Sequence, residues 1–309
     1  MELRHLYYFV AVAEELHFGR AAERLRIAQP PLSQQIQSLE QELGVQLFYR
    51  TKRQVQLTEA GELFLPEARL TLAQAEQAMQ TARKAGRGEV GRLMLGFVGS
   101  ATSELLPELI RQFRRQFPEV ELQLRELTTA QQVRALHDGR IQLGILRPPI
   151  PGEGLSLRIL AQETLIVALS DTHPLAALER IEVFALAQEN FIMFPRQQGP
   201  GLYDQIISLC RQAGFSPKIV QEAIQMQTIT SLVAAELGIA IVPSSARLLR
   251  QHGLSYRPLH PQAQATELAM AWSKDDQSPL LRNFVHLASR LYHVGEKADS
   301  LTGPDQPML

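Results

Sequence analysis

The sequence contains a single cysteine, Cys210, and no long run of uncharged residues. One thiol cannot form an intramolecular disulfide or a multi-thiolate metal site, and the helical pattern around it is typical of core packing. The longest stretch without a charged side chain, 223–235, spans about 13 residues, whereas a membrane-spanning helix needs about 20. Residues 1–11 carry charges and no basic leader before an apolar stretch. We therefore expect a reduced, cytoplasmic protein without membrane contact.

The composition is that of an ordinary globular protein, with 45% hydrophobic and 20% charged residues. A length of 309 residues predicts two or three domains. The formal net charge of −1 does not exclude nucleic-acid binding, because a basic patch is a local property. Such a patch occurs between Phe18 and Arg53, where six Lys and Arg residues stand against three Glu.

Three short helices are expected near the N-terminus. Apolar residues recur at helical spacing in 3–13 and 21–25, and Pro30 and Pro31 open a third segment that Gly44 ends. The outer face of this third segment carries only polar residues: Ser33, Gln34, Gln37, Ser38 and Gln41. This order fits a helix-turn-helix whose last helix enters the major groove, where Gln and Ser can hydrogen-bond base edges. The alternative is an ordinary solvated face.

Two further features favour the DNA-binding interpretation. Residues alternate with period two on both sides of the basic turn 50–53, which predicts a small hairpin, or wing. Arg20, Arg24 and Arg26 are expected close to the DNA backbone, where they would supply affinity while the Gln and Ser face supplies specificity.

A long helix is expected to follow over 58–88. Its a and d positions form an apolar seam of almost three heptads: Leu65, Ala68, Leu72, Ala75, Met79 and Ala82. This seam predicts a dimerising helix, and the alternative is a helix that packs on its own domain. The basic, glycine-containing segment 83–88 then marks a domain boundary.

Beyond residue 89, strand-length apolar runs alternate with amphipathic helices, a rhythm that implies βαβ units and a parallel sheet. We expect two lobes joined by crossovers near Ala161 and Thr266. Lobe I would comprise 89–161 and 266–294, lobe II 162–265, and residues 295–309 would form a flexible tail.

Several motifs together resemble one family. The stretch from Leu3 to Gly61 contains AAERL, QPPLSQQI, LEQELG, LFYR and LTEAG, and it closely resembles the N-terminal domain of LysR-type transcriptional regulators. Later segments, LPELIRQF and LVAAELGIAIVPSSA, are similar to that family's effector domain. Relatives with this type of recognition helix often respond to aromatic acids or their ring-cleavage products.

The resemblance implies an α/β protein with an N-terminal winged helix-turn-helix over 1–57, a dimerising linker helix and a two-lobed effector domain like a periplasmic binding protein. It also implies a homotetramer built as a dimer of dimers, which binds promoter DNA, RNA polymerase and a small effector. By position, Gln29, Pro30, Pro31, Ser33 and Gln34 match the recognition helix, and Gln37 lies on the same face. Arg50 and Arg53 match the wing that reaches a minor groove.

An effector site is expected where strands end and helices begin, because ligands of open α/β sheets bind at the carboxyl ends of strands. The side chains expected there are Ser100, Thr102, Thr129, Arg147, Gln198, Leu202 and Thr228. Hydroxyls and an arginine suit a small carboxylate, and the resemblance implies an aromatic or dicarboxylic acid. The alternative for the hydroxyls is simple helix capping.

An enzyme or a plain solute-binding protein of two-lobed fold is the alternative class. The sequence has no HExxH, GxxxxGK[ST], GxSxG or GxGxxG, so we expect no catalytic residue, cofactor or metal site. A solute-binding protein would leave the first ninety residues unexplained.

Overall fold

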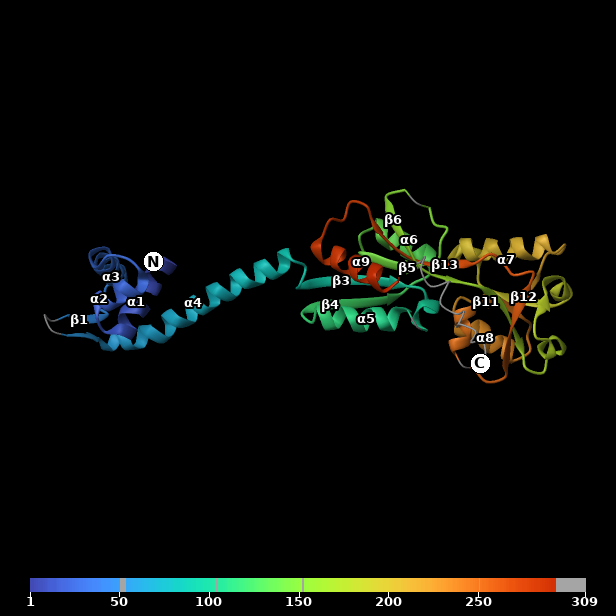
Figure 1. Ribbon diagram of the computed structural model, residues 1–309, viewed down its shortest axis with the longest axis horizontal. Helices are drawn as coiled ribbons and strands as arrows, with labels where there is room; N and C mark the ends of the chain where they lie inside the picture. The colour runs from blue at the N-terminus through green and yellow to red at the C-terminus, as the bar shows by residue number, and fades with distance from the viewer. Residues whose placement is uncertain (51–53, 104, 152, 250, 293–309) are drawn as a thin grey trace, which may run out of the picture. The chain divides into compact units, whose positions relative to one another are not determined.

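The computed structural model describes residues 1–50, 54–103, 105–151, 153–249 and 251–292 (Figure 1). The chain divides into two compact units, one from Met1 to Lys84 and one from Ala85 onward. The expected tail, 295–309, lies outside the described residues.

The first unit contains the predicted three-helix arrangement. Its helices are α1 (Leu3–Glu15), α2 (Phe18–Leu25) and α3 (Gln29–Leu43), followed by the strands β1 (Phe48–Arg50) and β2 (Val55–Leu57). His17 caps α2 by accepting hydrogen bonds from the backbone N–H groups of Gly19 and Arg20. Pro30 and Pro31 lie in the first turn of α3, where a missing N–H costs no helix hydrogen bond, and Gly44 ends that helix with a φ of 72°.

The predicted wing is present as the antiparallel pair β1–β2. Glu40 of α3 fixes its root, because this carboxylate accepts hydrogen bonds from the backbone N–H groups of Leu47 (2.9 Å) and Phe48 (3.2 Å). The same carboxylate lies 2.6 Å from the Arg50 guanidinium, which also stands over the Phe18 ring. The half-buried side chain of Glu40 therefore links the recognition helix to the wing.

The helix α4 (Glu59–Gly86) corrects the predicted seam. Ala68 and Leu72 are 1% and 9% exposed and belong to the core of the first unit, with Leu65 packed against it. The alternative of a helix packed on its own domain is therefore correct for the first half of α4. Leu63 and Leu70, which lie one heptad apart, are instead exposed by 69% and 64%. A heptad pattern alone does not tell which apolar stripe covers the chain's own core.

Lobe I of the second unit is a five-stranded sheet in the order β4-β3-β5-β13-β6. Its elements are β3 (Gly91–Phe97), β4 (Val120–Glu126), β5 (Leu143–Leu146), β6 (Leu155–Glu163), β13 (Thr266–Ser273), η1 (Gly99–Thr102), α5 (Leu105–Gln116), α6 (Thr129–His137) and α9 (Pro279–Leu291). The helices α5 and α9 cover one face of the sheet, and α6 covers the other.

Lobe II has two short sheets in one layer, β11-β7-β12-β8 and β10-β9, linked by a bridge between Phe191 and Ile239. Its elements are β7 (Leu165–Ser170), β8 (Ile181–Glu182), β9 (Asn190–Met193), β10 (Lys218–Glu222), β11 (Ala240–Pro243), β12 (Leu254–His260), η2 (Pro174–Ala177), η3 (Val183–Leu186), η4 (Arg196–Gln198), η5 (Ser244–Leu249), α7 (Pro200–Gln212) and α8 (Met226–Ala234). Alternate residues of β7 face α7 and α8, so both of its faces are buried. Cys210 lies fully buried against this strand's sheet, and burial raises the pKa of its thiol to about 11.

The sheets are mixed, which corrects the expectation of a parallel sheet. The strand β3 is parallel to β4 and β5, but β13 is antiparallel to both β5 and β6. The antiparallel strands β6 and β13 are the segments that leave and re-enter lobe I. The chain passes into lobe II after Glu163 and returns at Thr266, and these two residues are register partners in the ladder.

Candidate functional site

The recognition helix presents the predicted face. Leu32, Ile36 and Leu39 of α3 are buried in the core of the first unit. The predicted contact residues Gln29, Pro30, Pro31, Gln34 and Gln37 are exposed, and Ser33 is half-buried. Ser38 donates its hydroxyl hydrogen to the backbone carbonyl of Gln34, so this hydroxyl is already engaged. The remaining polar groups of the face are free to meet a base edge or a phosphate.

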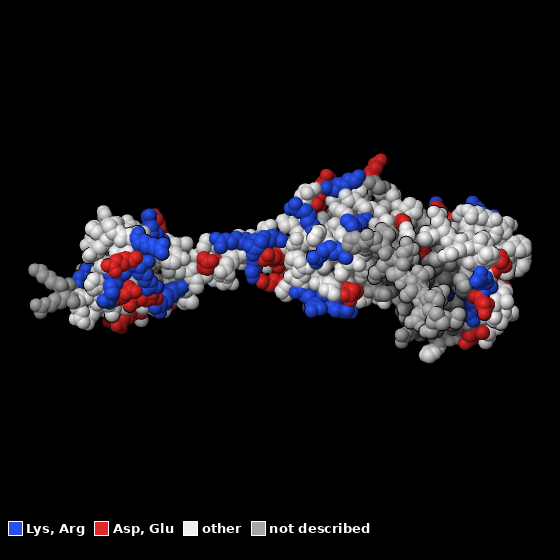
Figure 2. Space-filling view, viewed as in Figure 1, with Lys and Arg blue, Asp and Glu red and all other residues white. Residues whose placement is uncertain are grey.

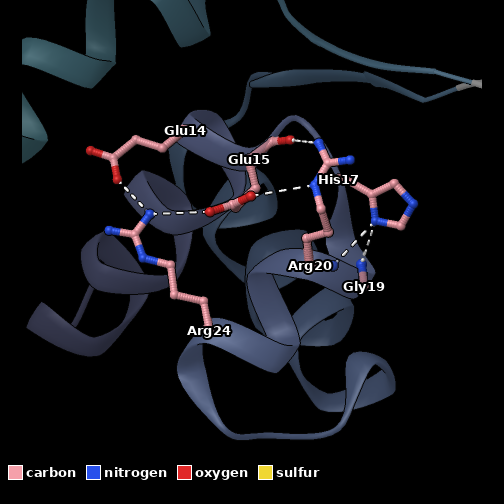
Figure 3. Close-up of polar contacts among 6 residues, drawn as sticks. All are labelled: Glu14, Glu15, His17, Gly19, Arg20 and Arg24. Atoms are coloured by element: carbon pink, nitrogen blue, oxygen red, sulfur yellow. Dashed lines mark hydrogen bonds and ion pairs between the residues drawn. The ribbon is translucent and has the colours of Figure 1, made fainter.

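Two arginines expected at the DNA backbone are neutralised within the chain (Figure 3). Arg20 pairs with Glu15 (3.3 Å), and Arg24 pairs with Glu14 (2.8 Å) and Glu15 (3.5 Å). Hydrogen bonds from Arg69 and Arg24 hold the pKa of the Glu14 carboxyl below its ordinary value. Within the part of the chain that the structure describes, Arg26 has no acidic partner. The glutamates that pair with Arg20 and Arg24 precede them by five to ten residues, on the other side of a turn. This spacing does not follow the three- or four-residue repeat of a helix, so the sequence pattern did not predict these pairs.

Arg50 is the one predicted wing arginine among the described residues. Arg50 is held by Glu40 and Phe18, so its guanidinium fixes the root of the wing. Arg53 lies outside the described residues.

A cavity of about 90 Å³ lies between the two lobes, at the strand ends where it was expected. The loops after β3, β4 and β5 line it from lobe I, and η4, α7 and the start of α8 line it from lobe II. Of the predicted residues it contains Ser100, Thr129, Arg147, Gln198 and Leu202.

Arg147 is the central polar group of this cavity and is only 5% exposed. Its Nε and Nη2 donate to the Ser100 hydroxyl (3.2 and 3.1 Å), and Nη2 lies 2.9 Å from a carboxylate oxygen of Glu163. Its Nη1 is buried and has no hydrogen-bond partner among the described residues. An unpartnered buried donor on a charged group is costly unless a ligand or water satisfies it.

Two neighbouring threonines at the start of α6, Thr128 and Thr129, make different contacts in the structure. Thr129 accepts a hydrogen bond from the backbone N–H of Arg147 (3.3 Å) and thereby fixes the end of β5. Thr128, which the sequence interpretation did not select, is the true N-cap of α6 and accepts from the backbone N–H of Gln131. Its hydroxyl also donates to the side-chain carbonyl of Gln198 across the cleft.

The predicted positions of Thr102 and Thr228 are corrected by the structure. Thr102 donates to the Gly99 carbonyl (2.6 Å) and lines a neighbouring cavity of about 260 Å³ rather than the cavity of Arg147. Thr228 is exposed and lines neither cavity, because α8 begins two residues earlier, at Met226. Gln225 and Met226 take its expected place in both cavities.

Glu163 is a site residue that the sequence interpretation missed. One carboxylate oxygen pairs with Arg147 of lobe I, and the other accepts a hydrogen bond from the backbone N–H of Ser245 of lobe II (3.2 Å). Glu163 stands at the end of β6, a strand that the apolar pattern did not predict because its exposed and buried positions do not alternate regularly.

In the described ranges, no group of three His, Cys, Asp or Glu side chains could hold a metal ion. No described helix has the length and apolar character needed to cross a bilayer.

A helix-turn-helix unit, a long connecting helix and a two-lobed domain with an interlobe cavity define a DNA-binding protein that carries a ligand-binding domain. Residues 3–62 match the family of bacterial regulatory helix-turn-helix proteins, lysR family, and residues 86–291 match the LysR substrate binding domain. The chain belongs to the LysR family of transcriptional regulators. It is thus a DNA-binding regulator with an effector-binding domain and not an enzyme.

Known relatives cover nearly the whole chain. The HTH-type transcriptional regulator AlsR of Bacillus subtilis is 45% identical, over 94% of this chain and 96% of that protein. IlvR of Caulobacter vibrioides is 41% identical, over 94% and 98%. The crystal structure of full-length CbnR complexed with its target DNA has a TM-score of 0.81 at 31% identity, and covers 94% of this chain and 99% of that chain. Regulators of this family bind promoter DNA and small-molecule effectors and form oligomers.

Proposed function

We propose that the protein works in the cytoplasm as a regulator whose effector is a short monocarboxylic acid held by Arg147. Two observations carry this proposal: Arg147 lines the interlobe cavity, and its buried Nη1 has no hydrogen-bond partner among the described residues. A guanidinium forms its strongest hydrogen bonds with anionic oxygens. Ser100 and Thr129 would orient Arg147, and Gln198 and Leu202 would close the cavity from lobe II.

The size of the cavity supports a short acid. An engineered apolar cavity of about 150 Å³ binds benzene, whereas the cavity at Arg147 measures about 90 Å³. A carboxylate with a chain of a few carbons fits this volume against Leu127, Leu202 and Ile224. An aromatic acid is the second candidate, favoured by the ring of Phe194 in the wall, and it would require the lobes to part.

The charges around the cavity disfavour a second carboxylate. Glu163 already balances Arg147, and Glu126 borders both this cavity and its neighbour. The described lining of the neighbouring cavity holds hydroxyl and amide groups but no cation. A second carboxylate there would meet Glu126 without a counter-charge, at an electrostatic cost.

We also propose the contacts with DNA and with other subunits. Gln29, Pro30, Pro31, Ser33, Gln34 and Gln37 would meet the major groove, with Arg26 on a phosphate, and Arg53 would extend from the wing that Arg50 anchors. Leu63 and Leu70 of α4 would form the dimer contact in a dimer of dimers. RNA polymerase would be the partner of the DNA-bound assembly.

The test is a thermal-unfolding panel on the full chain with acetate, propionate, butyrate, succinate and benzoate at matched ionic strength. An effector at about 100 times its Kd adds about 2.7 kcal/mol to the free energy of unfolding. We expect a rise in the unfolding midpoint with a short monocarboxylate, and we expect Arg147→Gln and Ser100→Ala to abolish it. Arg158→Gln, which removes an exposed arginine elsewhere in the same lobe, should leave it unchanged. A rise with benzoate or succinate alone would replace the proposed ligand class.

A further inference from the structure

The helices α5 and α9 form one side of lobe I. They pack through Phe113 and Phe284, whose ring centroids lie 4.8 Å apart, and both rings are fully buried in the lobe I core. Their outward positions are therefore presented on one continuous surface of a rigid layer.

This surface is rich in arginine. The two helices together carry five arginines and a single acidic residue, Glu108. The exposed cationic positions are Arg111, Arg114, Arg115, Arg282 and Arg290, with His286 between the last two, and we refer to them as the arginine face. On α9 the residues 282, 286 and 290 recur at every fourth position, so they form one stripe along the helix. Lys and Arg side chains gather over α5 and α9 in Figure 2.

Most of these arginines have no acidic partner among the residues that the structure describes. Arg111 pairs with Glu108, and Arg290 donates to the side-chain carbonyl of Gln116 (3.4 Å). Arg114, Arg115 and Arg282 have no acidic partner among the residues that the structure describes. Three arginines of the first unit differ in this respect, because Arg20, Arg24 and Arg50 are each paired with a glutamate. Other exposed arginines of the same unit, such as Arg125, Arg158 and Arg180, also have no acidic partner among the described residues, but Arg114, Arg115 and Arg282 lie together on two helices that pack against each other.

We propose that the arginine face binds the phosphate backbone of duplex DNA outside the sequence that the helix-turn-helix reads. The guanidinium fork matches phosphate oxygens. The stripe from residue 282 to residue 290 rises by about 12 Å along α9, which is the axial rise of three to four nucleotides of one strand. This inference rests on the DNA binding of the family and not on the identity of the effector.

Duplex DNA suits this face better than an acidic protein because the effector domain is tethered to DNA. Asn283 of α9 donates to the carbonyls of Arg87 (2.8 Å) and Gly88 (3.2 Å), directly after the end of the linker helix α4. The arginine face is thus attached through one helix to a unit that holds DNA. Tethering raises the local phosphate concentration, so that weak contacts become occupied.

The experiment compares the full chain with the triple variant Arg114→Gln/Arg115→Gln/Arg282→Gln. A binding sequence would first be selected by the parent chain from a randomised duplex pool. It would then be prepared with short flanks, or with flanks of about 40 base pairs on each side, and affinity would be measured against salt. The matched control is Arg125→Gln/Arg158→Gln/Arg180→Gln, which removes three exposed arginines from other surfaces of the same unit.

On the long duplex, we expect the triple variant to lower the slope of log K against log salt concentration by about 0.9 for each lost contact, or about 2 to 3 in all. On the short duplex, it should bind like the parent, and the control should match the parent on both. Equal slopes for parent and triple variant on the long duplex would overturn the proposal. A changed oligomeric state of the triple variant in sedimentation would also overturn it, since the face would then be a contact between subunits.

Discussion

The Thr128 hydroxyl donates a 2.9 Å hydrogen bond to the side-chain carbonyl of Gln198, and this bond joins the first turn of α6 in lobe I to η4 in lobe II. The same oxygen caps α6 by accepting from the backbone N–H of Gln131. One side chain thus couples the start of a helix to the contact between the lobes.

Separating these two functions gives the first prediction. Gln198→Leu removes only the interlobe bond, so it should weaken effector binding several-fold without lowering the unfolding midpoint. Thr128→Val removes the cap as well and should cost about 1 kcal/mol of stability. Thermal unfolding and effector titration would measure both effects. Equal stability losses in the two variants would show that the cap does not depend on Thr128.

The buried pair of Arg147 and Glu163, with side chains 5% and 12% exposed, gives the second prediction. Glu163→Gln leaves the arginine charge without its counter-ion and should lower the free energy of unfolding by about 3 to 5 kcal/mol. The double variant Glu163→Gln/Arg147→Met should recover part of that loss because the buried charge is gone. Chemical denaturation of Glu163→Gln, Arg147→Met and the double variant tests the coupling, and simple additivity would contradict it.

The third prediction concerns pH. The pKa of Glu14 is lower in the folded chain than its ordinary value, so the pairs with Arg69 and Arg24 stabilise the first unit above about pH 4.5 and are lost as the pH falls through the folded pKa. Glu14→Gln should cost up to about 1 kcal/mol at pH 7, a small figure because both arginines are half exposed. The difference should shrink in acid. Glu67→Gln, on exposed α4, is the control, and a pH-independent difference would remove the ionic explanation.

The two sides of α4 give the fourth prediction. Leu70→Glu alters an exposed position and should weaken self-association in sedimentation with little loss of monomer stability. Leu72→Ala, two residues away but buried in the core of the first unit, should lower stability by about 2 to 5 kcal/mol. An intact dimer in Leu70→Glu would assign dimerisation to another surface.

The recognition helix gives the fifth prediction. Ser33→Ala should reduce discrimination between duplex sequences by about 1 to 3 kcal/mol while nonspecific binding persists. Ser38→Ala should leave discrimination unchanged, because the Ser38 hydroxyl is occupied by the Gln34 carbonyl. Selection from randomised duplexes would compare the two, and an unchanged sequence preference in Ser33→Ala would exclude Ser33 from base readout.

Local signals in the sequence were sufficient for the DNA-binding unit. Pro30, Pro31 and Gly44 mark the ends of the recognition helix through backbone restrictions that act within a few residues, and the wing follows from its period-two pattern. The cavity at Arg147 was also predictable, because strand ends and helix starts meet there by topology.

The missed features depend on long-range geometry. Glu163 lies 16 residues from Arg147 and 82 residues from Ser245 in the chain, so only the fold brings these three residues together. The pairs of Arg20 and Arg24 with Glu14 and Glu15 form across a turn. Thr228 was misplaced because the start of α8 is not marked by a capping side chain. The first half of the heptad seam was misassigned because only tertiary packing shows that Leu65, Ala68 and Leu72 cover the core of the first unit. A dimer contact of its second half, at Ala75, Met79 and Ala82, stays a prediction.

The pairing of Glu163 with Thr266 makes lobe II an insertion with adjacent ends. The whole of 164–265 enters and leaves lobe I at neighbouring rungs of one ladder, so recombination at this point exchanges a sensor half without cutting the lobe I core or the helix-turn-helix. Lobe II supplies Gln198, Leu202 and Met226 to the cavity. Such an exchange therefore changes which effector binds and leaves the recognised DNA sequence unchanged. Evolution can thus diversify the signal and the target gene of such a regulator separately.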